Sequence, residues 1–188
     1  YNDNITEYVT SSITDMKISK ENNLYYLDLV EDSLKVINNG EYTPSVIVSG
    51  LNLNNDSKLL LLNDDTIAVS TNKVITIFDI NDGSVVAGIT LDDNIKSIDK
   101  DFYNNIYTLT THNIVKIDNI NHTLTPTTPL TYEASKLNYL QINKVSGDII
   151  CYDNYNNRLL KIHSNYVKKV TTVDKNVGST RLQVIFDT

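Results

Sequence analysis

Cysteine, tryptophan, glycine and proline are scarce in this sequence: one, none, six and three among 188 residues. The lone cysteine, Cys151, excludes an intrachain disulfide, and its apolar neighbours predict a small buried hydrophobic residue. One cysteine with three histidines is also too small a set for the usual zinc sites. Six scattered glycines provide no glycine-rich loop for phosphate. The composition therefore argues against disulfide scaffolds, zinc proteins and phosphate-loop enzymes.

Basic residues and long apolar runs are scarce as well. Sixteen Lys and Arg against 23 Asp and Glu give a formal net charge of −7, whereas nucleic-acid backbones need clustered positive charge. The apolar run at residues 59–62 is far shorter than the ~20 residues of a membrane-spanning helix. The sequence therefore predicts neither nucleic-acid binding nor a transmembrane segment, while its 40% of hydrophobic residues predict a buried core.

Short runs of Val, Ile, Leu, Thr and Tyr fill the chain, and clusters of Asn, Asp, Gly and Ser separate them. Helical periodicity is nearly absent, because no stretch keeps apolar residues at i, i+3, i+4 and i+7. Asn, Asp and Gly between apolar runs are typical of turns that join antiparallel strands. The predicted fold class is all-β.

The apolar runs recur with a period of about 40 residues. Leading aliphatic residues stand at positions 24, 67, 106 and 149, and the run that follows each of them ends in an Ile at 37, 77, 117 and 162. Two columns with the same period indicate four repeated units. Each unit is predicted to contain four antiparallel strands, because one further strand precedes each pair and one follows it. The preceding strands are predicted at 13–18, 58–62, 95–99 and 139–143, and the following ones at 45–49, 84–89, 124–128 and 167–173.

Four-stranded antiparallel units of this length are typical of the blades of a β-propeller. The predicted repeats span residues 13–49, 58–91, 95–130 and 139–173, and partial strands are predicted at 4–10 and 180–186. A single blade cannot cover both of its faces, so neighbouring blades must stack around an axis. Residues 1–188 are predicted to form one propeller domain or a segment of one.

Segment 67–79 carries the repeat pattern most clearly, with an aliphatic strand ending in Thr-Asn and a second strand ending in Asp. On this segment, and on the echoes at 24–38 and 106–118, the chain resembles the YVTN/quinoprotein-like β-propeller repeats. The fourth repeat departs from the pattern, with residues 151–153 (Cys-Tyr-Asp) in place of the Thr-Asn ending and His163 in place of the terminal Asp. The resemblance implies a propeller fold but no particular activity, because many functions share this repeat.

Two arrangements fit the ends of the pattern. The start at Tyr1 and an ending in mid-blade favour a segment of a longer propeller. The alternative is a compact ring of four to five blades in which one blade is incomplete.

No catalytic constellation is visible in the sequence. The three histidines, His112, His122 and His163, lie in or beside predicted turns without a nucleophile signature. The chain is therefore predicted not to be an enzyme, and the alternative is a lactonase- or lyase-like propeller enzyme with a site at the channel mouth. Asp92 and Asp93 lie between two predicted blades and are candidates for a Ca²⁺ site in the channel, although no cofactor is predicted.

Loops that combine tyrosine with asparagine are the predicted binding surface, because aromatic rings supply contact area and amides supply adaptable hydrogen bonds. The chain is thus predicted to be a binding or structural module for a protein or glycan partner. By analogy with phage tail or receptor-binding proteins and bacterial surface proteins, an extracellular, cell-surface or virion location is favoured. The predicted binding residues are Tyr103, Asn104, Asn105, Asp153, Asn154, Tyr155 and Asn156.

Overall fold

The computed structural model describes residues 12–121, 123–127 and 134–162. Within these ranges the chain forms fifteen strands and one 3-10 helix, η1 (Ala134–Lys136). No helix in the described part is long and apolar enough to cross a bilayer. The all-β prediction is confirmed.

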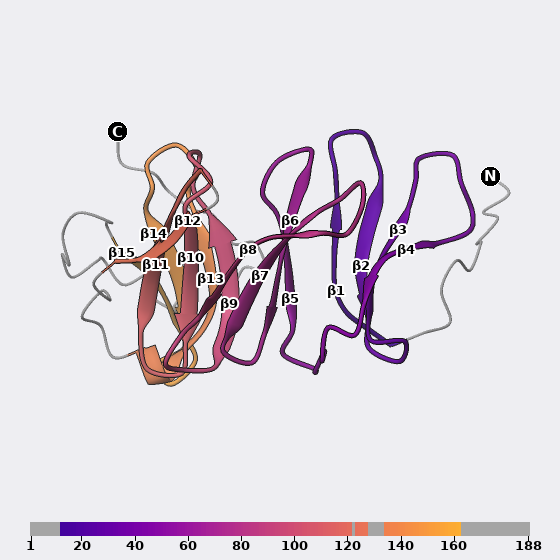
Figure 1. The fold of residues 1–188 in the computed structure, drawn as a ribbon. Coiled ribbons are helices and arrows are strands. Elements are labelled where there is room, and N and C mark those ends of the chain that lie inside the picture. The colour runs from indigo at the N-terminus through magenta and orange to yellow at the C-terminus, as the bar shows by residue number, and fades with distance from the viewer. Residues whose placement is uncertain (1–11, 122, 128–133, 163–188) are drawn as a thin grey trace, which may run out of the picture.

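The strands form four antiparallel sheets, each built from consecutive strands. Figure 1 shows the first three sheets in chain order, and contacts between β9 and β13 place the fourth sheet beside the third. We call the sheets blades 1 to 4. Blades 1 and 2 contain β1 (Ile13–Ile18), β2 (Leu24–Asp28), β3 (Ser33–Ile37) and β4 (Ser45–Ser49), then β5 (Lys58–Leu61), β6 (Thr66–Thr71), β7 (Val74–Asp79) and β8 (Val85–Thr90). Blades 3 and 4 contain β9 (Ile95–Lys100), β10 (Ile106–Thr110), β11 (Ile114–Ile120) and β12 (Thr123–Pro126), then β13 (Leu137–Ile142), β14 (Ile149–Asp153) and β15 (Arg158–Ile162).

The predicted four-stranded unit is confirmed in blades 1 to 3, and blade 4 has three strands among the described residues. Its predicted last strand at 167–173 lies outside the described residues, as do the partial strands predicted at 4–10 and 180–186. Pro126 ends β12, the outer edge strand of blade 3, where a missing N–H donor breaks no ladder.

One column of the predicted repeat is displaced in the structure. Leu24, Ile106 and Ile149 pair with the second-column residues at 37, 117 and 162, but Ile67 pairs with Phe78 and not with Ile77. Since side chains alternate along a strand, a shift by one residue exchanges the two faces. Ile77 therefore faces blade 3, whereas Phe78 faces blade 1.

Hydrophobic side chains fill the spaces between neighbouring blades, so middle strands such as β6 and β10 are covered on both faces. In β10, Ile106 packs toward blade 2, whereas Tyr107 and Leu109 pack toward blade 4. This double burial explains why the middle strands are nearly continuous apolar runs. Each fully buried Leu or Ile side chain contributes about 1.5–3 kcal/mol. The cluster between blades 1 and 2 contains Tyr25, Leu27, Leu34, Val36, Leu59, Ile67, Val69 and Phe78.

Polar side chains also tie the first strands of neighbouring blades together. The Leu59 amide donates to Asp15 Oδ2 over 2.9 Å, and the Leu140 amide donates to Ser97 Oγ over 3.2 Å. The Ile142 amide donates to Asp99 Oδ2 over 2.8 Å. First strands are sheet edges with unpaired backbone groups. The neighbouring blade satisfies these three donors.

The abundant asparagine has a structural use in the turns. Eight residues other than glycine have a positive φ in the described part, and six of them are Asn. Asn tolerates this left-handed region better than most residues, because its short polar side chain bonds locally. The other two are Asp32 and Tyr139, and Tyr139 has φ of 58° at a bulge in β13.

Candidate functional site

The first turn of each blade lies at one end of the molecule. Asp15 contacts Leu59 and Lys20 contacts Asp64, so β1 and β5 run in the same direction. The Lys100 ammonium reaches the carbonyl oxygen of Leu62, which joins the third turn to the second. We call this the first-turn end, formed by residues 19–23, 62–65, 101–105 and 143–148.

The predicted binding residues at 103–105 lie at this end, in the turn between β9 and β10. Asp101 holds the turn: its Oδ1 accepts the amides of Tyr103 and Asn105, both over 2.9 Å, and its Oδ2 accepts Asn105 Nδ2 over 2.8 Å. Asn104 has φ of 64°, and its Oδ1 accepts a hydrogen bond from Lys100. Asn104 and Asn105 are thus engaged within the turn itself.

Two aromatic side chains project from this turn. Phe102 is 75% exposed and Tyr103 is 78% exposed. Their rings meet edge to face, with centroids 5.5 Å apart. Tyr103 belongs to the predicted binding surface, whereas Phe102, the ring that packs against it, was not predicted.

The other predicted group, residues 153–156, lies at the opposite end. Since Ser97 contacts Leu140 and Asp99 contacts Ile142, β13 runs parallel to β9. The turn between β14 and β15 therefore points away from the first-turn end. The structure does not bring the two predicted groups together.

Within that turn, Asp153 is buried and Tyr155 is exposed. Asp153 Oδ1 accepts the amides of Tyr155 and Asn156, and its Oδ2 accepts Arg158 Nε over 2.8 Å. Burial opposes ionisation of Asp153, but the hydrogen bonds from Asn156 and Arg158 outweigh burial and lower its pKa. Tyr155 is 74% exposed, with Lys136 Nζ 4.8 Å from its ring centre. Asn154 is exposed beside it.

The same device occurs at the end of β2 in blade 1. Asp28 Oδ1 accepts the amides of Val30 and Glu31, both over 3.0 Å, and its Oδ2 accepts Lys35 Nζ over 2.8 Å. Asp28 and Asp153 hold equivalent places, since each is four residues after the leading aliphatic of its blade. Asp153, predicted as a binding residue, thus holds a turn as Asp28 does.

Asp92 and Asp93 lie in the connection between blades 2 and 3. Asp93 Oδ1 is 3.1 Å from His112 Nδ1. Across the described ranges, no three His, Cys, Asp or Glu side chains gather in a way that could hold a metal ion. Cys151 is buried as predicted, and burial raises the pKa of its thiol to about 12, so it stays protonated at neutral pH.

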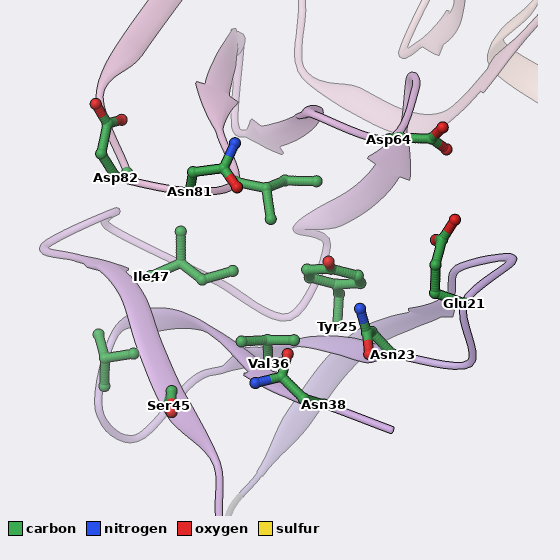
Figure 2. Close-up of a pocket in the computed structure, with 13 residues that line it drawn as sticks. Glu21, Asn23, Tyr25, Val36, Asn38, Ser45, Ile47, Asp64, Asn81 and Asp82 are labelled. Carbon is green, nitrogen blue, oxygen red and sulfur yellow. The ribbon is translucent and has the colours of Figure 1, made fainter. Parts of the chain in front are cut away.

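A cleft of about 480 Å³ opens between blades 1 and 2 at the first-turn end. Figure 2 shows Glu21 and Asp64 on one side of the cleft, Asp82 on the opposite side, and Tyr25 between them. The apolar floor is formed by Tyr25, Val36, Ile47 and Ile80, and the polar wall also includes Asn23, Asn38 and Asn81. This cleft was not predicted from the sequence, because its residues come from five separate segments of the chain.

No protein-family model matches the sequence, and a search of curated proteins finds no match. Solved structures do match. Virginiamycin B lyase from Staphylococcus aureus has a TM-score of 0.66 at 13% identity, and the match covers 89% of this chain and 57% of that one. The Cps50 (Swd1) beta-propeller domain of Myceliophteria thermophila has a TM-score of 0.69 at 9% identity, with 87% and 56% covered. The fold is a β-propeller.

This propeller spans about half the length of the structures it matches. The prediction that the chain is not an enzyme is contradicted by the comparison, because virginiamycin B lyase is an enzyme with the same kind of fold. A catalytically inactive variant of that lyase with quinupristin also matches, with a TM-score of 0.65 at 13% identity, over 82% of this chain and 53% of that one. At such identities the likeness shows the propeller fold alone and assigns no reaction.

Proposed function

We propose that this propeller binds a partner protein through its first-turn end, with Phe102 and Tyr103 as the main contacts. The observation that carries the proposal is an exposed aromatic pair on a turn fixed by Asp101. Interfaces depend on a few aromatic anchors, which contribute most when their backbone is already ordered. The blades serve as a rigid support for this turn. Because segment 67–79 resembles YVTN repeats, we propose that the blades belong to that repeat family.

The arrangement of the turn supports this function. Asp101 is buried and bonds two backbone amides of the turn, so the turn loses little conformational freedom when a partner binds. An exposed Phe next to an exposed Tyr offers a large apolar area with one hydrogen-bonding group. Protein surfaces of this kind are enriched in interfaces.

The test selects binding peptides from a phage-displayed random-peptide library and measures their affinity for a variant with both Phe102→Ala and Tyr103→Ala. Binding is expected to weaken by about tenfold or more, because aromatic anchors carry most of an interface's energy. The matched control is Tyr155→Ala, which removes an equally exposed tyrosine at the opposite end and is expected to change the affinity less than about twofold.

Peptides that bind the double variant as tightly as the wild-type protein would contradict the proposal. An immobilised glycan panel is probed in parallel with both proteins. A glycan whose capture depends on Phe102 and Tyr103, without any peptide that does, would replace the protein partner with a carbohydrate.

A further inference from the structure

The cleft between blades 1 and 2 already holds one positive charge at its edge. The Lys20 ammonium bonds Asp64, and it lies 3.6 Å from Glu21 Oε1. Two carboxylates that share one ammonium are spaced to receive a single cation. Lys20 is 66% exposed, so its ion pairs are weak and a competing cation can displace it.

A second carboxylate position lies across the cleft. Asp82 Oδ1 accepts the amide of Ser84 over 2.8 Å, and hydrogen bonds from Ser84 lower the pKa of Asp82. This carboxylate is therefore ionised at neutral pH. With Glu21 and Asp64 it gives the cleft three carboxylates, of which Asp64 bonds Lys20 and is also attracted electrostatically to Lys100.

Tyr25 provides an independent sign of a ligand. Its side chain is only 4% exposed, yet its hydroxyl has no hydrogen-bond partner in the part of the chain that the structure describes. Figure 2 shows the hydroxyl at the end of the ring that points into the cleft. The oxygen is not among the described side-chain atoms that are both fully buried and unpaired, so it opens to the cleft and offers a polar position that a bound group would satisfy.

The floor of the cleft is apolar. Val36 and Tyr25 belong to the core cluster between the two blades, and Ile47 and Ile80 pack against that cluster. An aliphatic chain laid across this floor would have its polar end among the carboxylates. The side chains that combine a methylene stem with a cationic head are Lys and Arg.

We propose that this cleft binds the Lys or Arg side chain of an extended segment of a partner protein. The stem lies on Tyr25, Val36 and Ile47, and the head group replaces Lys20 between Glu21 and Asp64. The Tyr25 hydroxyl then gains a partner on the bound segment. This site is separate from the Phe102–Tyr103 turn, and the proposal does not rest on the function proposed above.

The test is an NMR titration of the wild-type protein with the peptide acetyl-Ala-Ala-Lys-Ala-Ala-amide. Shifts are expected at the amides of Asn23, Asn81 and Gly83. A peptide with norleucine in place of Lys keeps the stem without the charge and is expected to bind about tenfold more weakly. An equally tight norleucine peptide, or shifts confined to other parts of the chain, would overturn the proposal.

Three substitutions at the cleft probe the head-group position. Glu21→Gln and Asp64→Asn are each expected to weaken binding of the Lys peptide about fivefold to tenfold. Lys20→Gln is expected to tighten binding about threefold or more, because it removes the internal competitor without removing a carboxylate. A Lys20→Gln variant that binds more weakly than the wild-type protein would contradict the displacement of Lys20.

Two further variants complete the test. Tyr25→Phe keeps the ring in the core and removes the hydroxyl, and it is expected to weaken binding about threefold. Asp56→Asn removes one exposed carboxylate outside the cleft and serves as the control for net charge. If Asp56→Asn weakens binding as much as Asp64→Asn, the attraction is only that of the protein's overall charge and the site is disproved.

Discussion

Replacing Asp28 with alanine is expected to lower the free energy of unfolding by about 3–5 kcal/mol, as for the loss of one partner of a buried ion pair. Asp28 and Lys35 are 1% and 6% exposed, and their charged atoms are 2.8 Å apart. Burial works against the charged form of Lys35, but its hydrogen bonds to Asp28 and Glu31 raise its pKa overall. Without Asp28, a nearly buried ammonium loses its buried partner, and the turn amides of Val30 and Glu31 lose their acceptor.

Urea denaturation of the wild-type and variant proteins measures this effect. The control is Glu31→Gln, which removes the other carboxylate on Lys35, 2.7 Å away but 61% exposed. An exposed partner contributes little, so the control is expected to cost less than about 1 kcal/mol. Equal losses in the two variants would show that burial does not distinguish the two ion pairs.

Replacing Gly83 with alanine is expected to lower the free energy of unfolding by about 2–4 kcal/mol. Gly83 lies in the turn between β7 and β8 with φ of 71°, a conformation that costs other residues about 1–2 kcal/mol. A methyl group here would also overlap the backbone carbonyl oxygen of Ile47 in blade 1. A backbone atom cannot turn aside as a side chain can, so the two blades would have to separate.

Gly40→Ala separates the two causes of this loss. Gly40 has φ of 81°, but its added methyl group would meet no atom within 4 Å. Its expected cost is the conformational part alone, about 1–2 kcal/mol. If urea denaturation gives the same loss for both variants, the contact between Gly83 and Ile47 contributes nothing to the packing of blades 1 and 2.

Much of the fold could be predicted from the sequence, because strands, turns and repeats leave local signals. The strands at 13–18 and 45–49 have the predicted bounds. The displaced column at Ile77 and Phe78 could not be resolved, because both residues are apolar and buried on opposite faces. β13 begins two residues before its predicted start, where the positive φ of Tyr139 forms a bulge that the sequence does not announce.

The candidate sites were less predictable, because they depend on contacts between distant residues. Tyr103 is exposed, but Asn104 and Asn105 form hydrogen bonds within their own turn. The composition of a loop does not show which of its residues are exposed for binding and which hold the turn. The polar turn after Asp153 predicts a binding residue, whereas the hydrogen bonds by which Asp153 and Asp28 each hold a turn appear only in the structure. The cleft brings together Glu21 of blade 1 and Asp82 of blade 2. The repeat period predicts the blades, but it does not predict which residues of neighbouring blades meet.

The hydrogen bonds between the first strands of neighbouring blades allow the separation of blades to be measured by hydrogen exchange. The amide hydrogens of Leu59 and Leu140 are held by Asp15 and Ser97 of the preceding blade, so they become free when two blades part. Amides paired within one sheet become free only when that sheet opens. Deuterium uptake at Leu59 and Leu140 that outpaces uptake in the middle strands would therefore record the parting of intact blades, and matched uptake would record unfolding of the propeller as one cooperative unit.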